Sequence, residues 1–116
     1  ELTYSGRIID ASEALKLNLV SSIYDSENLL DNALDFAKNM VKNSAPVSIA
    51  VTRQMLWRSL EGSGPYDAHI VESKAIDSRG ASEDAKEGVS SFLEKRAAEF
   101  KNKVSEDMPS FFPWWK

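Results

Sequence analysis

The feature of this 116-residue sequence that most constrains its fold is a recurrence of apolar residues every three to four positions over most of the chain. It is clearest between Asp25 and Asn43. Six apolar residues of that segment recur at this spacing and share one helical face: Leu30, Ala33, Leu34, Ala37, Met40 and Val41. The same spacing continues over residues 46–60, 66–78 and 82–103. Such periodicity predicts amphipathic helices and therefore a mainly α fold.

Short polar signals and breaks divide these helices. Pro46 suits the first turn of a helix, because the N–H that proline lacks would be unpaired there. The run Gly62–Pro65 is the strongest break in the chain. Asp10, three residues before Glu13, resembles a capping box and predicts a helix over Ala11–Leu17.

The predicted boundaries leave room for one strand. The helix over 11–17 is expected to end at Asn18, a residue type that tolerates left-handed backbone. The β-branched and aromatic residues of Leu19–Tyr24 then favour a short strand. Gly80 ends the helix over 66–78, and Ser82 can cap the last helix. We therefore expect about five helices and at most one short strand.

The last residues have a different character. Met108–Trp115 is an aromatic segment interrupted by proline, so it cannot form a regular helix. Four aromatic residues lie in the last six positions: Phe111, Phe112, Trp114 and Trp115. We therefore divide the chain into a helical domain, residues 1–104, and an extended aromatic tail, residues 105–116. The tail is expected to be an arm packed on its own or a neighbouring subunit, with a docking motif for a different protein as the alternative.

Composition excludes several classes of function. The 14 Lys+Arg against 18 Asp+Glu give a formal net charge of −4, which argues against a general nucleic-acid binder. No apolar run approaches the roughly 18 residues of a membrane span, and no signal segment opens the chain. Without Cys and with His69 alone, we expect no metal site, and a cytoplasmic protein. Because the chain opens on Glu1 and has no initiator Met, we expect a piece of something larger.

Charged clusters near the end of the helical region leave alternatives open. Glu83, Asp84 and Glu87 look like paired carboxylates, but a solvated helix start explains them more simply. A local basic cluster follows: Lys95, Arg96, Lys101 and Lys103. It either complements the negative end of a helix or meets a phosphate-bearing ligand.

Three stretches in fixed order carry a family pattern. The first is ELTYSGR at residues 1–7, with DASEA at 10–14 and NLV at 18–20. The second is SAP at 44–46, before Thr52-Arg53, and the third is SEDAKEGVSSFLEKR at 82–96. Together they resemble the C-terminal part of the enoyl-CoA hydratase/isomerase (crotonase) family, whose third motif reads S-x-D-x-x-E-G-x-x-A-F-x-E-K-R. The chain departs from the family at Ser5, where Thr is usual, and at Asn18, where Gly is usual.

The resemblance implies a fold and a chemistry. The fold would be the helical C-terminal segment of the crotonase (ClpP/crotonase-like) fold, which serves assembly into trimers or dimers of trimers. The substrate would be an acyl-CoA thioester, with no cofactor other than the coenzyme A that is part of it. In the family, two backbone N–H groups stabilise an enolate, and in hydratases two glutamates act as general base and acid.

The resemblance also implies site residues. The second glutamate of the family lies five residues before the Gly of its T-G-R motif, which is Glu1 here. The first glutamate and the oxyanion N–H groups belong to the family's N-terminal core, outside this sequence. Phe92 and Lys95 correspond to residues that reach the coenzyme A of a neighbouring subunit. Two alternatives stay open: Glu1 is a solvated terminus, and Phe92 belongs to the core.

These implications give a first functional hypothesis. The chain is expected to be the C-terminal segment of a lyase that adds water in the syn sense to a 2-enoyl-CoA, inactive by itself. Isomerisation or thioester hydrolysis are alternatives within the family. A non-catalytic helical interaction module is the alternative from another class, and self-association is expected under both.

Overall fold

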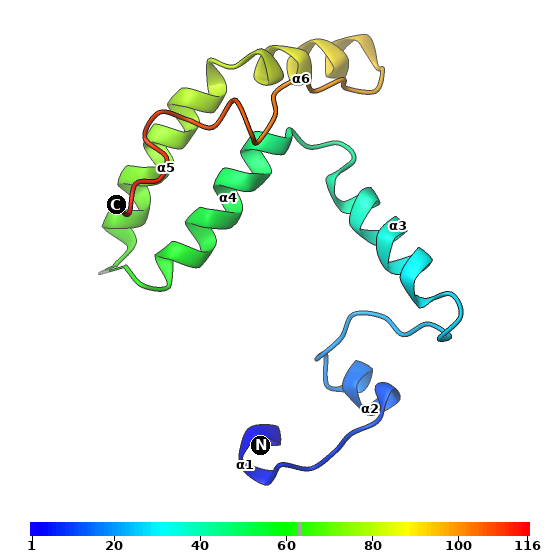
Figure 1. Ribbon diagram of the computed structural model, residues 1–116. Coiled ribbons are helices and arrows are strands. Elements are labelled where there is room, and N and C mark those ends of the chain that lie inside the picture. The colour runs from blue at the N-terminus through cyan, green and yellow to red at the C-terminus, as the bar shows by residue number, and fades with distance from the viewer. Residues whose placement is uncertain (63) are drawn as a thin grey trace. The chain divides into compact units, whose positions relative to one another are not determined.

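The computed structural model describes residues 1–62 and 64–116, and Figure 1 shows its helices. Ser63, within the break predicted at Gly62–Pro65, lies outside the described residues. The helices in the described part of the chain are α1 (Leu2–Ser5), α2 (Ala11–Lys16), α3 (Leu29–Val41), α4 (Pro46–Ser59), α5 (Pro65–Gly80) and α6 (Glu83–Glu94). These residues contain no strand, which confirms the mainly α prediction. The chain divides into two compact units, residues 1–38 and 39–116, each described below by itself.

Local signals decide the start and end of α2. The Asp10 carboxylate accepts the backbone N–H of Glu13 at 2.7 Å, which confirms the predicted cap. That hydrogen bond lowers the pKa of Asp10. Asn18 is left-handed, with φ 56°, as the sequence predicted. The chain can therefore reverse directly after α2.

The strand predicted over Leu19–Tyr24 is wrong. The N–H groups of Leu19 and Val20 donate back to the carbonyl of Ala14, at 2.9 and 3.4 Å, and so close the end of α2. The remaining residues are irregular, and no strand lies among the described residues to pair with them. A β-branched run forms a strand only where a partner takes its backbone hydrogen bonds.

The helix predicted over Asp25–Asn43 is shorter in the structure. Asp25–Asn28 form a turn, closed by the Asn28 N–H donating to the Asp25 carbonyl at 3.0 Å. The helix α3 then begins at Leu29 and ends at Val41, and none of its residues is buried. Its apolar face is predicted correctly but is not covered within the described chain.

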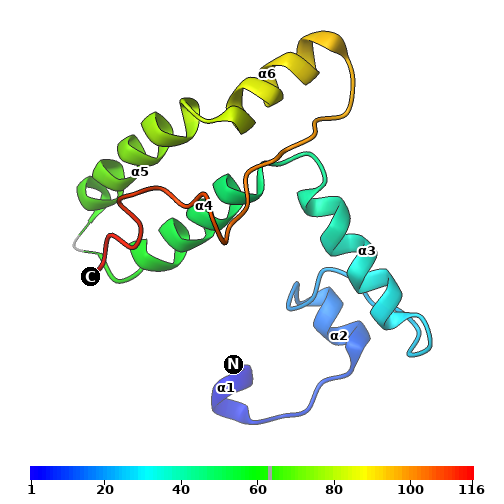
Figure 2. The same ribbon diagram turned by 45° about the horizontal axis from the view of Figure 1, so that its top comes forward.

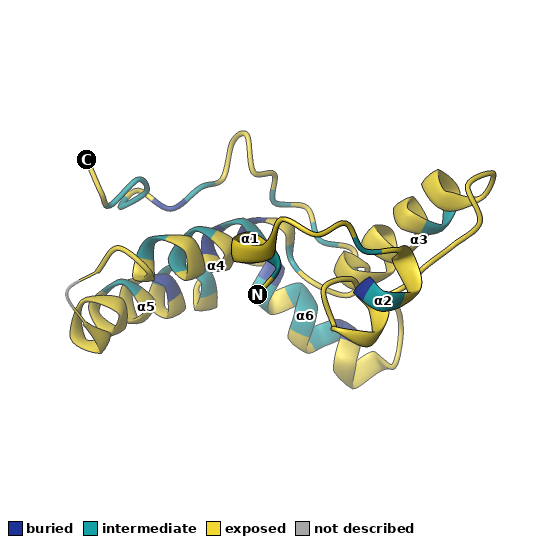
Figure 3. Ribbon diagram, turned by 90° about the horizontal axis from the view of Figure 1, so that it is seen from below, coloured by how far each residue is buried: buried dark blue, intermediate teal, exposed yellow. Residues whose placement is uncertain are grey.

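The second unit is built on the packing of α4 against α5 and of α5 against α6. Val47, Val51 and Ala75 form its buried core. Met108 and Phe111, from the tail, pack against this core. Both α4 and α5 begin with proline, which confirms the prediction for Pro46. Figure 3 shows buried stretches on α4, α5 and the tail, whereas α3 is largely exposed.

The last helix ends earlier than its apolar spacing predicts. Ser82 caps α6 as expected, its Oγ accepting the Ala85 N–H at 3.2 Å. The helix ends at Glu94 and not near Lys103, because Lys95 turns left-handed with φ 56°. The chain then runs back past α6 toward α4, as Figure 2 shows. Side chains of α6 bind the backbone of this returning segment, as described below.

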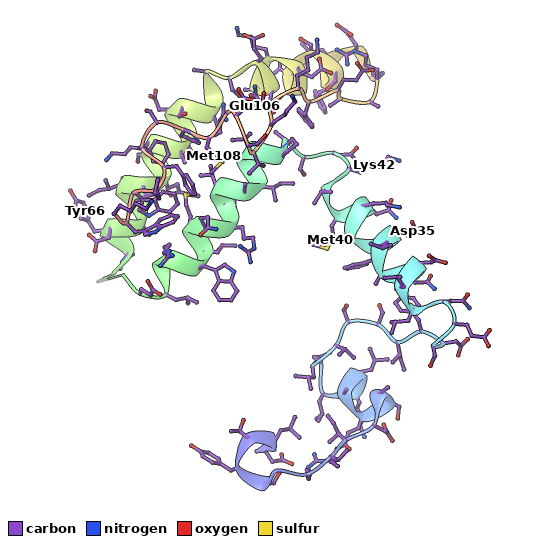
Figure 4. All side chains as sticks on the ribbon, in the orientation of Figure 1. Asp35, Met40, Lys42, Tyr66, Glu106 and Met108 are labelled. Atoms are coloured by element: carbon purple, nitrogen blue, oxygen red, sulfur yellow. The ribbon has the colours of Figure 1, made fainter. Side chains whose placement is uncertain are left out.

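The tail is not helical, as predicted, and it packs on its own unit. Figure 4 shows Met108 pointing into the space between α4 and α5. Pro109 is buried. The rings of Phe112 and Trp115 meet edge to face with centroids 5.1 Å apart, and those of Trp114 and Trp115 with centroids 5.0 Å apart. The tail therefore closes the core that α4 and α5 begin.

Candidate functional site

The candidate site residues fall into two groups, each in its own unit. Glu1 belongs to the first unit, and Phe92 and Lys95 belong to the second. The structure brings Phe92 and Lys95 together at the end of α6. The contacts of each group lie within its own unit.

Glu1 precedes α1 and is one of two carboxylates that flank Arg7. The Arg7 guanidinium lies 2.7 Å from Glu13 Oε1 and 3.2 Å from Glu1 Oε1. These contacts, the one with Glu13 above all, raise the pKa of Arg7. Gly6, left-handed with φ 62°, ends α1 and allows Arg7 to turn back toward both carboxylates.

The Glu1 side chain remains open to solution. It is 80% exposed. An ion pair this exposed holds its partners weakly, because water and salt screen the charges. The carboxylate is therefore accessible to a molecule that approaches from solution.

At the end of α6, Phe92 is 81% exposed. The alternative that Phe92 belongs to the core is therefore wrong for the described chain. Val89 and Leu93 on the same helix are also exposed, so Phe92 is one of three exposed apolar side chains in this part of α6. Lys95 follows Phe92 by less than one turn, and its N–H donates to the Phe92 carbonyl at 3.3 Å. An aromatic face and an ammonium thus stand at one exposed helix end.

The carboxylates of α6 do not form a solvated helix start. Asp84 is 3% exposed, and its Oδ1 accepts the N–H groups of Lys101 and Asn102 at 2.8 and 3.1 Å. Only Glu83 fits the prediction, since it is exposed and pairs with Lys86 at 2.6 Å. The prediction is wrong for Asp84 because the chain returns and covers this carboxylate. No local sequence pattern indicates that return.

Glu87 contradicts the same prediction. Its two oxygens bind the Arg96 guanidinium, Oε2 at 2.9 Å from Nη2, and Oε1 also accepts the Glu99 N–H at 2.8 Å. The Arg96 guanidinium, and next the Glu99 N–H, lower the pKa of Glu87 to about 2. The one signal in the sequence is the spacing of Asp84 and Glu87, which places both on the same face of a helix.

The cations of the basic cluster predicted at residues 95–103 differ in whether they have an ion-pair partner. Arg96 is bound by Glu87 and by Glu94, whose Oε2 lies 2.6 Å from Arg96 Nε. Lys103 pairs with Glu106 at 3.2 Å. Lys95 has no ion-pair partner among the residues that the structure describes. Within the cluster, Lys95 is therefore a cation available to a ligand.

A separate hollow of about 280 Å³ opens where the tail meets α4 and α5. Met55, Ala68, Val71 and Trp114 contribute to its lining. The Arg58 guanidinium stacks 4.4 Å from the centroid of the Trp115 ring beside it. None of the site residues predicted from the sequence lines this hollow.

Two properties of the described residues bear on other classes of function. None of the helices in residues 1–62 and 64–116 is long and apolar enough to cross a membrane. In the same residues, no group of three or more His, Cys, Asp or Glu is arranged to hold a metal ion.

The chain is similar to known proteins over most of its length. The family model described as enoyl-CoA hydratase/isomerase matches residues 1–103. Enoyl-CoA hydratase ACTT3 from Alternaria alternata is 32% identical over 119 residues, covering 89% of this chain and 40% of that protein. A probable enoyl-CoA hydratase from Rhizobium meliloti is 35% identical over 103 residues, covering 89% and 39%.

The chain is also similar to part of a solved structure. The crystal structure of an enoyl-CoA hydratase/isomerase from Mycobacterium paratuberculosis matches with a TM-score of 0.69 and 28% identity. The match covers 84% of this chain and 38% of that one. The chain thus spans about two fifths of the length of the proteins it matches.

Proposed function

The chain belongs to the enoyl-CoA hydratase/isomerase family, and from this premise we propose that it is the C-terminal segment of an enzyme that processes acyl-CoA thioesters. Its fold is a helical segment of the crotonase fold. The observation that carries the proposal is the end of α6, where Phe92 and Lys95 occupy the positions of the family's F-x-E-K-R motif. Phe92 is exposed there, and Lys95 has no ion-pair partner among the described residues.

The reaction that we propose for the intact protein is hydration. The oxygen of water bonds to the β carbon of a 2-enoyl-CoA and a proton is delivered to the α carbon, so the double bond is consumed and nothing leaves. Relatives named enoyl-CoA hydratases support this choice over isomerisation or thioester hydrolysis. The substrate brings its own coenzyme A, and no further cofactor is required.

Glu1 is proposed as one of the two glutamates that handle water and proton. Its exposure and its contact with Arg7 support this role, since an open carboxylate can reach a substrate that binds over it. The other glutamate and the N–H groups that stabilise the enolate would come from residues outside this sequence. The 116-residue chain is therefore inactive by itself.

Phe92 and Lys95 are proposed to contact coenzyme A bound by a neighbouring subunit. An ammonium is a suitable charge for a phosphate, and an aromatic face stacks on a nucleotide base. Exposed apolar residues on the same helix support assembly into a trimer or a dimer of trimers, which would cover them: Val89 and Leu93. Since the chain has no Cys, we place the enzyme in the cytoplasm.

The experiment that tests the proposal measures hydration of crotonyl-CoA by the intact protein. We expect Glu1→Gln to lower kcat about 100-fold or more, because the amide cannot exchange the proton. Glu27→Gln, in the exposed turn before α3, is the matched control and should leave kcat unchanged. Full activity of Glu1→Gln would contradict the catalytic role.

The non-catalytic interaction module is supported by one observation, the uncovered apolar face of α3. The same assay separates the two functions. An intact protein that binds partner chains but hydrates, isomerises and hydrolyses no acyl-CoA would favour the module. Hydration of crotonyl-CoA by residues 1–116 alone would contradict the proposal that part of the active site comes from residues outside this sequence.

A further inference from the structure

The end of α6 has an unusual residue at its turning point. The Lys95 N–H donates to the Phe92 carbonyl at 3.3 Å, and the Arg96 N–H donates to the Ser91 carbonyl at 3.0 Å. These two hydrogen bonds form a Schellman motif, in which the left-handed residue is usually glycine. Here that residue is Lys95, with φ 56°. A side chain at this φ costs conformational energy that glycine would avoid.

The next residue is held by three contacts. Arg96 binds both oxygens of Glu87, and its Nε lies 2.6 Å from Glu94 Oε2. Glu87 lies about two turns earlier on α6, so its ion pair with Arg96 holds the chain against the helix after the chain reverses. Glu87 also accepts the Glu99 N–H at 2.8 Å, and this hydrogen bond holds the returning segment against α6.

These contacts of Arg96 fix the Lys95 backbone and leave the Lys95 ammonium free. The residues before and after Lys95, Glu94 and Arg96, form an ion pair with each other. Lys95 itself is exposed and has no ion-pair partner in the described part of the chain. A fixed backbone limits the directions that a long side chain can take and lowers the entropy lost when its ammonium is bound.

We infer that the Glu87–Arg96 pair positions Lys95: it holds the left-handed turn so that the Lys95 ammonium meets the phosphates of coenzyme A. This inference rests on the proposed function, since it deepens the role of Lys95 in acyl-CoA binding. Glu87 and Arg96 are positioning residues and do not touch the substrate. A glycine at position 95 would make the turn without strain but would carry no charge, which explains why a strained lysine stands there.

A purely structural role for the pair predicts a different outcome. If Glu87 and Arg96 only fasten residues 96–99 to α6, their loss affects every substrate in the same way. If they position Lys95, their loss affects only substrates that carry the nucleotide phosphates. The N-acetylcysteamine thioester of crotonate has the reacting group and lacks those phosphates.

The test measures kcat and KM of the intact protein for crotonyl-CoA and for crotonyl-N-acetylcysteamine. For Glu87→Gln we expect KM for crotonyl-CoA to rise about fivefold with kcat unchanged, and both constants for the short thioester to stay at the wild-type values. Glu83→Gln on the same helix is the matched control and should change neither. An unchanged KM for crotonyl-CoA, or equal changes for both thioesters, would overturn the inference.

Arg96→Lys provides a second route, because it keeps the charge but loses the two-pronged contact with Glu87. We expect the same selective rise in KM for crotonyl-CoA. Circular dichroism of each variant verifies that α6 is retained. A rise shared by both thioesters would again overturn the positioning role.

A double-mutant cycle with Lys95→Gly separates this inference from the function on which it rests. Lys95→Gly keeps the turn and removes the ammonium, so it should raise KM for crotonyl-CoA, and adding Glu87→Gln should raise it no further. If the effects of the two substitutions on KM for crotonyl-CoA multiply, the inference is overturned, but the proposed contact of Lys95 with coenzyme A is not. An active Lys95→Gly enzyme with unchanged KM would overturn both, and absence of any hydration by the wild type would overturn the proposed function itself.

Discussion

The helices α3 and α6 carry similar apolar stripes but are held in opposite ways. No residue of α3 is buried, whereas α6 buries Asp84 and Ser91 and binds the chain that returns along it. The contacts that hold α6 to the returning chain are polar: two carboxylates in the first half of the helix, Asp84 and Glu87, accept the backbone N–H groups of residues 99, 101 and 102. An apolar stripe therefore predicts that a helix forms, but polar long-range contacts decide whether it is fixed within this chain.

The largest effect expected from this difference comes from removing Asp84. Asp84→Ala leaves the partly buried N–H groups of Lys101 and Asn102 without their acceptor, which should cost about 2 to 3 kcal/mol of unfolding free energy. Asp31→Ala, in the exposed first turn of α3, is the matched control, with a cost of about 0.5 kcal/mol. Urea unfolding of the 116-residue chain followed by circular dichroism measures both. Equal costs would show that α6 is held no better than α3.

The same contrast explains which parts of the fold were predictable. The caps at Asp10 and Ser82 and the left-handed Asn18 were predicted correctly, because each depends on residues within one turn. The helix α6 was predicted too long, since Phe100 still falls at helical spacing although the chain reverses at Lys95. That reversal depends on contacts with Glu87, nine residues from Arg96, which no local period contains.

The candidate site was predictable to a different degree. Composition and periodicity gave no site, and Glu1, Phe92 and Lys95 were identified only through the resemblance of three motifs. The structure adds that Phe92 is exposed, and it adds Glu87 and Arg96 beside Lys95. The roles of Glu1, Phe92 and Lys95 remain predictions, because their chemistry requires residues outside this sequence.

A second comparison uses one phenylalanine from each unit. Phe111 packs against the core of Val47, Val51 and Ala75, so Phe111→Ala should lower the unfolding free energy by about 2 kcal/mol. Phe36, on α3, is 50% exposed, and Phe36→Ala should lower it by about 0.5 kcal/mol. Urea midpoints of the two variants give the ratio. A larger loss for Phe36 would mean that the tail is not part of the core.

The smallest expected effect is a change in acid sensitivity at the end of α6. The pKa of Glu87 is about 2 in the folded chain, below its ordinary value of 4.5, so the unfolded chain binds a proton first as the pH falls. The stability contributed by the Glu87–Arg96 pair is therefore complete above about pH 5 and is lost between about pH 5 and pH 2. Glu87→Gln should be less stable than the wild type at neutral pH and should lose less stability across this window. Thermal unfolding at a series of pH values measures the slope, and an unchanged slope in Glu87→Gln would show that the pair does not hold α6 to the returning chain.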